Sequence, residues 1–218
     1  MRFFGDNLTC IRGERIVFAG LGFSVSPGDA VVLTGRNGSG KTSLLRVMAG
    51  LTPSATGGLA WDDGLVSENP ERHRSRLHYV GHLDAVKPVL SVRENLLLWT
   101  RLRGGDDAGV VAGLARFGLD ALADVPGRYL SAGQRRRLSL ARLVATPAAL
   151  WLLDEPTIAL DRESVASLID AIDVHRDGGG MVVIATNVAL TLDNAGTIDM
   201  AAFALDRAAL EDEEPSAA

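Results

Sequence analysis

The sequence has a single cysteine, no long hydrophobic run and no excess of positive charge, and each shortage excludes a class of protein. Cys10 cannot form a disulfide within the chain, so a reducing compartment is permitted. No apolar run approaches the ~18 residues of a membrane span, and the opening segment MRFFGDNLTC lacks the features of a signal peptide. The net charge of −5 argues against a general nucleic-acid binder. We therefore expect a protein that is soluble or meets a membrane only through a partner.

Length and composition favour one α/β domain over residues 1–207, followed by an acidic tail. The chain has 218 residues, of which 47% are hydrophobic, and this is enough for one substantial core. Residues 208–218 are acidic, and we expect them to be disordered. The basic cluster Arg135-Arg136-Arg137 is short, and we interpret it as a solvated turn of a helix.

Three apolar runs, at 30–35, 149–155 and 181–186, are typical of parallel strands that are buried on both faces. Helical patterns follow the first run, precede the second and separate the second from the third, which predicts a doubly wound α/β sheet. The opening segment alternates instead and has Gly and Pro at turn spacing, which predicts an antiparallel layer beside the parallel core. Residues 84–145 have helical spacing and form a predicted helical insertion.

The segment GRNGSGKT lies between the first predicted strand and a predicted helix. It fits the pattern G-x-x-x-x-G-K-[ST], in which glycines let backbone N–H groups surround phosphates and the helix N-terminus adds partial positive charge. Lys41 is expected to reach the β- and γ-phosphates, and Thr42 to bind Mg²⁺. The predicted phosphate site consists of Gly35, Arg36, Asn37, Gly38, Ser39, Gly40, Lys41, Thr42 and Ser43.

A second candidate site follows the apolar run LWLLDEP. Asp154, at the predicted strand end, can hold Mg²⁺ through water, and Glu155 can polarise an attacking water as a general base. Two acids after an apolar run can also be an ordinary strand end with a solvated turn. The complete phosphate motif favours the functional interpretation.

The segment LSAGQRRRLSLARL, at 130–143, indicates the class of nucleotide hydrolase. It resembles the LSGGQ signature of ABC (ATP-binding cassette) ATPases, with Ala132 in place of the first glycine. The order of phosphate motif, signature and acidic strand end also matches, and IALD at 158–161 resembles the D-loop. The resemblance covers about residues 6–206 and implies a P-loop NTPase core that binds ATP and Mg²⁺.

Membership of that family would imply a head-to-tail homodimer that holds ATP between the phosphate loop of one copy and the signature of the other. Asp161 of the D-loop would cross the dimer interface. The signature residues that would meet the γ-phosphate from the facing copy are Ser131, Ala132, Gly133 and Gln134.

Longer segments are similar to one family among these ATPases. RGER at 12–15, YVGHLDAVKPVLSVRENL at 79–96 and the signature segment resemble the A subunits of the cytochrome c maturation system, the CcmA family. That resemblance implies a haem-exporting ATPase on the cytoplasmic face of the bacterial inner membrane. It also implies a CcmB-like integral subunit, with CcmC- and CcmD-like subunits, on which the segment 84–145 docks.

Two other functions stay open on the sequence. One is the ATPase of another small ABC exporter, because the membrane subunits choose the substrate. The other is a slow ATP-driven switch, in which binding regulates an assembly and turnover is incidental. A P-loop GTPase is disfavoured because the chain lacks N-K-x-D, and a DNA-repair ABC protein because long coiled-coil insertions are absent.

Besides Ala132, three positions depart from the general family pattern, and Arg12 and His82 are the first two. Most members of the family stack an aromatic residue on adenine, and the spacing to the phosphate motif places Arg12 at that position. Arg12 either stacks on the base through a cation–π contact or is an exposed arginine at a strand end without a ligand. His82 occupies the position where the family has a glutamine that binds a metal-bound water. It can bind that water, or it can be a hinge residue that makes no metal contact. His73, His78 and His175 lack metal-ligand spacing, and we interpret them as surface or strand-edge residues.

The third departure is Asn187, which replaces the family's γ-phosphate histidine directly after the run 181–186. An amide can donate one hydrogen bond but carries no proton for transfer, and its shorter side chain puts the reach to the phosphate in question. Losing one preorganised donor costs ~10²–10³ in rate, which predicts slow hydrolysis with ATP binding and dimer closure retained. The alternative is that this lineage tolerates asparagine with full activity.

Overall fold

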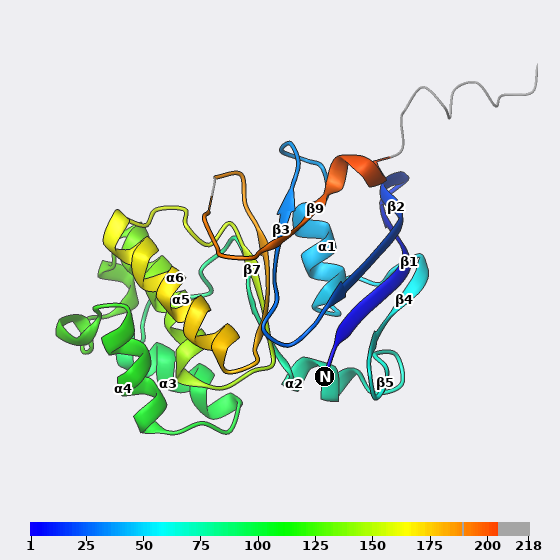
Figure 1. Ribbon diagram of the computed structural model, residues 1–218. Helices are drawn as coiled ribbons and strands as arrows, with labels where there is room; N and C mark the ends of the chain where they lie inside the picture. Colours follow the sequence, from blue (N-terminus) through cyan, green and yellow to red (C-terminus); the bar gives the residue numbers. More distant parts are fainter. Residues whose placement is uncertain (189, 205–218) are drawn as a thin grey trace, which may run out of the picture.

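The computed structural model describes residues 1–188 and 190–204, so the predicted acidic tail at 208–218 lies outside the described residues. The described part contains two sheets with helices between and beside them (Figure 1). The antiparallel sheet has the order β2 (Arg15–Val25), β1 (Phe3–Arg12), β4 (Thr56–Trp61), β5 (Gly64–Leu65). The parallel sheet has the order β6 (Leu77–Val80), β7 (Leu150–Asp154), β8 (Met181–Ala185), β3 (Ala30–Thr34), β9 (Gly196–Asp199). The predicted α/β core with an N-terminal antiparallel layer is confirmed.

The parallel sheet contains the three predicted buried strands as β3, β7 and β8. Every residue of β7 and β8 is buried, because the sheet is covered on both faces, and this explains the lack of alternation. The register pairs both Leu33 and Asp154 with Ala185. The carboxyl ends of these three strands therefore lie side by side at one edge of the sheet.

The described residues also form six α-helices. They are α1 (Lys41–Met48), α2 (Pro70–Ser75), α3 (Val92–Leu102), α4 (Asp107–Arg116), α5 (Ala132–Ala145) and α6 (Arg162–Asp177), with 3₁₀ turns at Asp120–Leu122, Gly127–Tyr129 and Met200–Phe203. None of the described helices is both long and apolar enough to span a bilayer.

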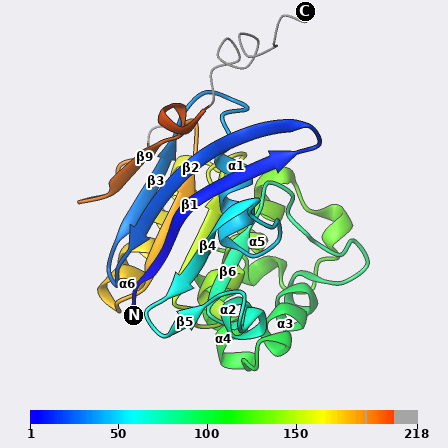
Figure 2. The same cartoon turned by 90° about the vertical axis from the view of Figure 1, so that its right-hand side faces the viewer.

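Helix α1 lies between the two sheets, and the antiparallel sheet curves over it (Figure 2). Its fully buried Leu44, Leu45 and Met48 join Phe3 and Phe18 of the antiparallel sheet in one core cluster. This packing fixes the start of α1 directly beyond the end of β3, where the phosphate motif lies.

Helices α3, α4 and α5 pack on one another, and α5 and α6 lie near the other face of the parallel sheet (Figure 1). A capping box of Ser91 and Glu94 begins α3, and the Asp106 side chain caps α4. The predicted helical insertion at 84–145 contains these three helices, although 84–91 is not helical. Its standing as a separate subdomain stays a prediction.

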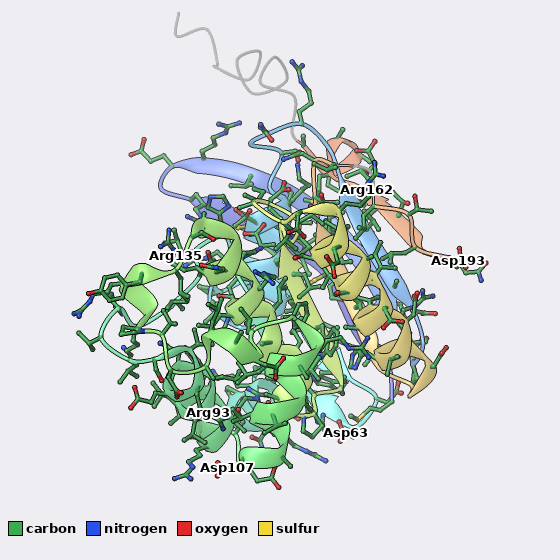
Figure 3. All side chains as sticks on the ribbon, turned by 90° about the vertical axis from the view of Figure 1, so that its left-hand side faces the viewer. Asp63, Arg93, Asp107, Arg135, Arg162 and Asp193 are labelled. Carbon is green, nitrogen blue, oxygen red and sulfur yellow. The ribbon has the colours of Figure 1, made fainter. Side chains whose placement is uncertain are left out.

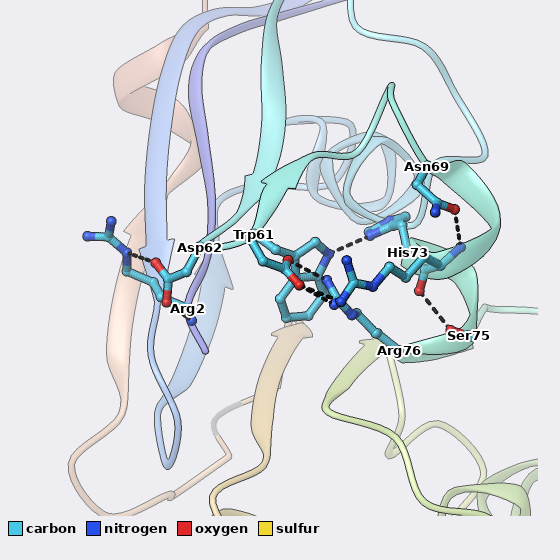
Figure 4. Close-up of polar contacts among 9 residues, drawn as sticks. Arg2, Trp61, Asp62, Asn69, His73, Ser75 and Arg76 are labelled. Atoms are coloured by element: carbon cyan, nitrogen blue, oxygen red, sulfur yellow. Dashed lines mark hydrogen bonds and ion pairs between the residues drawn. The ribbon is translucent and has the colours of Figure 1, made fainter.

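Two of the histidines expected at the surface are buried, which corrects that prediction. His73 is 2% exposed, and its Nδ1 accepts from Trp61 Nε1 at 3.0 Å (Figure 4). Its Nε2 donates to the Met48 carbonyl at 2.9 Å. His78 lies on the edge strand β6 as expected but is 7% exposed and bonds the Thr146 carbonyl, and burial lowers its pKa to about 3. Spacing alone does not reveal such rings, because each packs as an aromatic group and satisfies its N–H on a backbone carbonyl.

The third histidine, His175, is half-buried on α6 and stacks on Trp151 with ring centroids 3.9 Å apart. It contacts the carbonyl of Met181, at the start of β8. It therefore lies at the opposite end of that strand from Asn187 and cannot take the place of the histidine that Asn187 replaces.

Candidate functional site

The predicted site residues gather at the edge where β3, β7 and β8 end. A cleft of about 550 Å³ opens there. It is lined by Arg12, Arg15, Val17, Asn37, Gly38, Ser39, Gly40, Lys41, Thr42, Ser43, Glu155 and Asn187. Open α/β sheets place ligand sites outside the carboxyl ends of their strands, so the position agrees with the sequence prediction.

The loop between β3 and α1 takes its shape from glycine. Gly35, Gly38 and Gly40 have φ angles of 133°, 82° and 100°, a region that other residues rarely occupy. Helix α1 begins at Lys41, so its first N–H groups and the positive end of its dipole belong to the cleft. This is a backbone arrangement that binds anions such as phosphate.

Lys41 is 6% exposed, and its ammonium group is held by the loop itself. Its Nζ donates to the carbonyls of Gly35 (2.6 Å) and Arg36 (3.3 Å) and to Oδ1 of Asn187 (2.8 Å). A buried cation that is held over the loop supplies positive charge where phosphate oxygens would lie.

Asp154 ends β7 and lies against the first turn of α1. Its Oδ1 accepts from the Thr42 hydroxyl at 3.0 Å, and the residue is 1% exposed. Its Oδ2 is buried and has no hydrogen-bond partner among the described residues. A carboxylate oxygen that lacks a partner, beside a hydroxyl, is the type of oxygen donor set that Mg²⁺ prefers, so these residues fit a divalent cation.

Glu155 follows Asp154 in a strained conformation and is joined to Asn187. Its φ of 47° lies in the left-handed region, which for a non-glycine residue marks strain that surrounding contacts must hold. The Asn187 backbone N–H (3.2 Å) and side-chain Nδ2 (2.5 Å) donate to its two carboxylate oxygens. Asn187 therefore reaches Glu155 with one side of its amide and Lys41 with the other, whereas its contact with a phosphate stays a prediction.

Arg136 is a functional candidate that the sequence analysis missed, since the basic cluster was expected to be solvated. Its side chain is 3% exposed, and all five N–H groups of a guanidinium find acceptors. The acceptors are the carbonyls of Gly81 (2.8 Å), Asp154 (2.7 Å), Glu155 (2.8 Å) and Pro156 (3.2 Å), and Asp84 Oδ1 (3.2 Å). The available signal was its place three and four residues before Ser139 and Leu140, on the side of α5 that carries these buried residues.

Other predicted residues lie outside the cleft lining. His82 is exposed and does not line the cleft, so its metal contact stays a prediction. Ser131 caps α5 through a capping box with Gln134, and Asp161 caps α6. A Cβ added to Gly133 would lie 2.7 Å from the Ala159 carbonyl, so the signature packs closely on the D-loop.

The signature and D-loop nevertheless share one side of the molecule. Figure 3 shows Arg135, at the start of α5, and Arg162, at the start of α6, near the same end. Ser131, Ala132 and Asp161 are exposed there. These groups are thus available to a second molecule, and the resemblance to ABC ATPases implied that they would face a second copy of the chain.

Comparison with known proteins identifies the family to which the chain is similar. The family model described as ABC transporter matches residues 18–158. The cytochrome c biogenesis ATP-binding export protein CcmA of Rhodospirillum rubrum is 54% identical over 216 residues, which cover 97% of this chain and 93% of that protein. CcmA of Paramagnetospirillum magneticum is 55% identical over 207 residues, covering 93% of this chain and 95% of that protein.

Solved structures agree on the fold. An ABC transporter ATP-binding protein from Pyrococcus furiosus superposes with a TM-score of 0.81 at 19% identity, covering 94% of this chain and 100% of that one. A dimeric ATP-binding cassette bound to ADP and Pi superposes with a TM-score of 0.76 at 22% identity, covering 85% and 88%.

The two loop glycines Gly38 and Gly40 give a matched pair of variants. A Cβ on Gly40 would lie 2.8 Å from Val17 Cγ1, whereas a Cβ on Gly38 would meet nothing within 4 Å. Both have positive φ. We expect Gly38→Ala to lower the free energy of unfolding by about 1 kcal/mol through backbone strain, and Gly40→Ala by about 2–4 kcal/mol because overpacking adds to that strain. Urea denaturation measures both, and equal losses would contradict the close approach of β2 to the loop.

Proposed function

The chain belongs to the ABC transporter family of ATP-binding proteins, and from this premise we propose that it is the ATP-hydrolysing subunit of the haem exporter of cytochrome c maturation. The observation that carries the hydrolytic part is the junction of Lys41, Asp154, Glu155 and Asn187 at one sheet edge. The identity to CcmA proteins over nearly the whole chain supports the haem-exporter assignment. ATP is the nucleotide of this family.

In the proposed mechanism the loop Gly35–Ser43 binds the ATP phosphates through backbone N–H groups, and Lys41 contacts the terminal phosphates. Thr42 and Asp154 would hold Mg²⁺, which neutralises phosphate charge when it is bound. His82 remains the proposed ligand of a metal-bound water. Arg12 remains the proposed adenine contact, and its place in the cleft lining supports that role.

Glu155 is the proposed general base. Its carboxylate lies in the cleft and is oriented by two donors from Asn187, so it can take a proton from a water near the γ-phosphate. The left-handed backbone at Glu155 turns its side chain out of the strand direction and toward Asn187. Positioning of this kind costs nothing further during the reaction, because the fold already holds it.

The site is completed by a second copy in this proposal. Ser131, Gly133 and the N-terminus of α5 would meet the γ-phosphate of the facing copy, and Asp161 would cross between the copies. The exposure of Ser131 and Asp161 supports this arrangement. The peripheral location at the cytoplasmic face of the inner membrane, with CcmB-, CcmC- and CcmD-like partners, is part of the same proposal.

Substitution of the proposed base tests the function. Glu155→Gln should lower Mg²⁺-dependent ATP turnover of the assembled membrane complex by about 10²-fold or more while ATP binding is retained, because only the proton acceptor is removed. Glu163→Gln, on the exposed first turn of α6, is the matched control and should keep wild-type turnover. Hydrolysis at the wild-type rate in Glu155→Gln would show that Glu155 is not the general base, whereas absent Mg²⁺-dependent turnover in the wild-type complex would contradict the proposed ATPase.

Replacement of Asn187 tests the prediction of slow turnover. Asn187→His should raise turnover of the complex by about 10-fold or more, since a protonatable donor then meets the developing phosphate charge. Asn187→Ala should lower turnover, because the side-chain hydrogen bonds of Asn187 with Glu155 and with Lys41 are both lost. Unchanged turnover in Asn187→His would mean that the amide is sufficient, and very low turnover in every variant would favour the ATP-driven switch.

The docking site for the membrane partner is proposed to be a groove between β6, α3 and α5. This groove, of about 400 Å³, contains Leu51, Trp99, Arg103 and Arg142, and none of the described residues that line it is acidic. Arg103 has a buried Nε without a partner among the described residues, and burial lowers its pKa. Burial also lowers the pKa of Arg142, to about 10. A groove with apolar walls and arginines that no lining carboxylate neutralises favours binding of a partner segment that presents a carboxylate between apolar side chains.

Charge reversal on α3 tests this groove. Arg103→Glu should weaken association with the membrane partner at least tenfold, because it repels the proposed carboxylate. Arg101→Glu, exposed on the same helix, is the control and should associate like the wild type. Co-purification from membranes measures both, and equal retention of the two variants would place the docking surface elsewhere.

A further inference from the structure

The guanidinium of Arg136 joins three segments that are far apart in the sequence. It belongs to α5, the helix that begins with the signature. It donates to the loop 81–84 through one terminal nitrogen, and to the backbone at 154–156 through the other terminal nitrogen and Nε. The loop 81–84 contains the proposed ligand His82, and 154–156 contains the proposed base.

The chemistry of these contacts requires arginine. Four of the five acceptors are backbone carbonyls that converge from two directions on one buried plane, and Asp84 neutralises the charge. A planar guanidinium has five donors in a fixed fork, whereas a lysine ammonium has three donors at one point. Lysine would therefore keep the charge but lose contact with at least one of the two segments.

The contacts reach the backbone on both sides of the strained residue. Arg136 holds the carbonyls of Asp154 and Pro156, and it also holds the carbonyl of Glu155, whose φ is 47°. Asn187 holds the carboxylate of the same residue. The conformation of Glu155 is thus fixed at its backbone from α5 and at its side chain from the end of β8.

We propose that Arg136 is a positioning residue that ties the orientation of the signature helix α5 to the placement of the Glu155 carboxylate. A shift of α5 would be passed through the guanidinium to both the base and the loop 81–84. Since the signature at the start of α5 would meet the facing copy, dimer closure would be coupled to the placement of the Glu155 carboxylate. This inference rests on the proposed ATPase function.

Turnover of the assembled complex tests the role with a neighbouring arginine as control. Arg136→Lys should lower kcat for ATP at least tenfold with KM within about twofold of wild type, since the phosphate loop is untouched. Arg137→Lys should leave kcat unchanged, because the hydrogen bonds of Arg137 within the described part of the chain go to the carbonyls of Phe117 and Gly118, which do not line the cleft. Combined with Glu155→Gln, Arg136→Lys should cause no further loss of rate, because it acts through that residue. Equal kcat in Arg136→Lys and wild type would overturn the proposal.

Hydrogen exchange supplies a readout that does not depend on hydrolysis. In Arg136→Lys the amides of Glu155 and Asn187, which bond Ala185 and the Glu155 carboxylate, should exchange at least tenfold faster than in wild type. Arg137→Lys should accelerate exchange in the 117–118 turn instead. Unchanged exchange at both site amides in a folded Arg136→Lys variant would refute the positioning role, whereas absent ATPase in the wild type would count against the proposed function alone.

Discussion

The register of three parallel strands is the constraint on which the rest of the structure depends. Because β3, β7 and β8 run in the same direction and pair without offset, their carboxyl ends meet. Thr42 thereby bonds Asp154 across 112 residues of sequence, and Lys41 bonds Asn187 across 146. A slip of one residue would turn each strand's side chains to the opposite face and separate these groups.

Burial gives this edge its electrostatic character. Lys41, Arg136 and Asp154 are 6%, 3% and 1% exposed, although charged groups are rarely buried unless they are paired. The two cations are held mainly by backbone carbonyls, and Asp154 keeps one oxygen that has no partner within residues 1–188 and 190–204. Charged groups fixed in a medium of low dielectric act strongly on a bound polyphosphate, since they need no rearrangement to do so.

Asn187 acquires a more definite meaning from its neighbours. The sequence indicated only that an amide replaced a histidine at a strand end. The structure shows that this amide donates to Glu155 and accepts from Lys41, so it links the proposed base to the lysine that is proposed to bind phosphate. An asparagine can do both at once because its amide has a donor and an acceptor, which a neutral histidine ring would offer from two nitrogens in a different geometry.

Local residue types were enough to predict a phosphate loop, a signature and an acidic strand end in this order along the chain, because the spacing of each motif constrains the backbone directly. They were also enough to predict the buried strands, since short continuous apolar runs are typical of strands that are covered on both faces. The partners of the polar groups, by contrast, depend on the fold. Arg136 resembled a solvated charge and proved buried, and His73 and His78 lacked any ligand spacing yet pack inside. The reason is that burial of a polar group depends on acceptors brought from distant segments, and no local pattern records them.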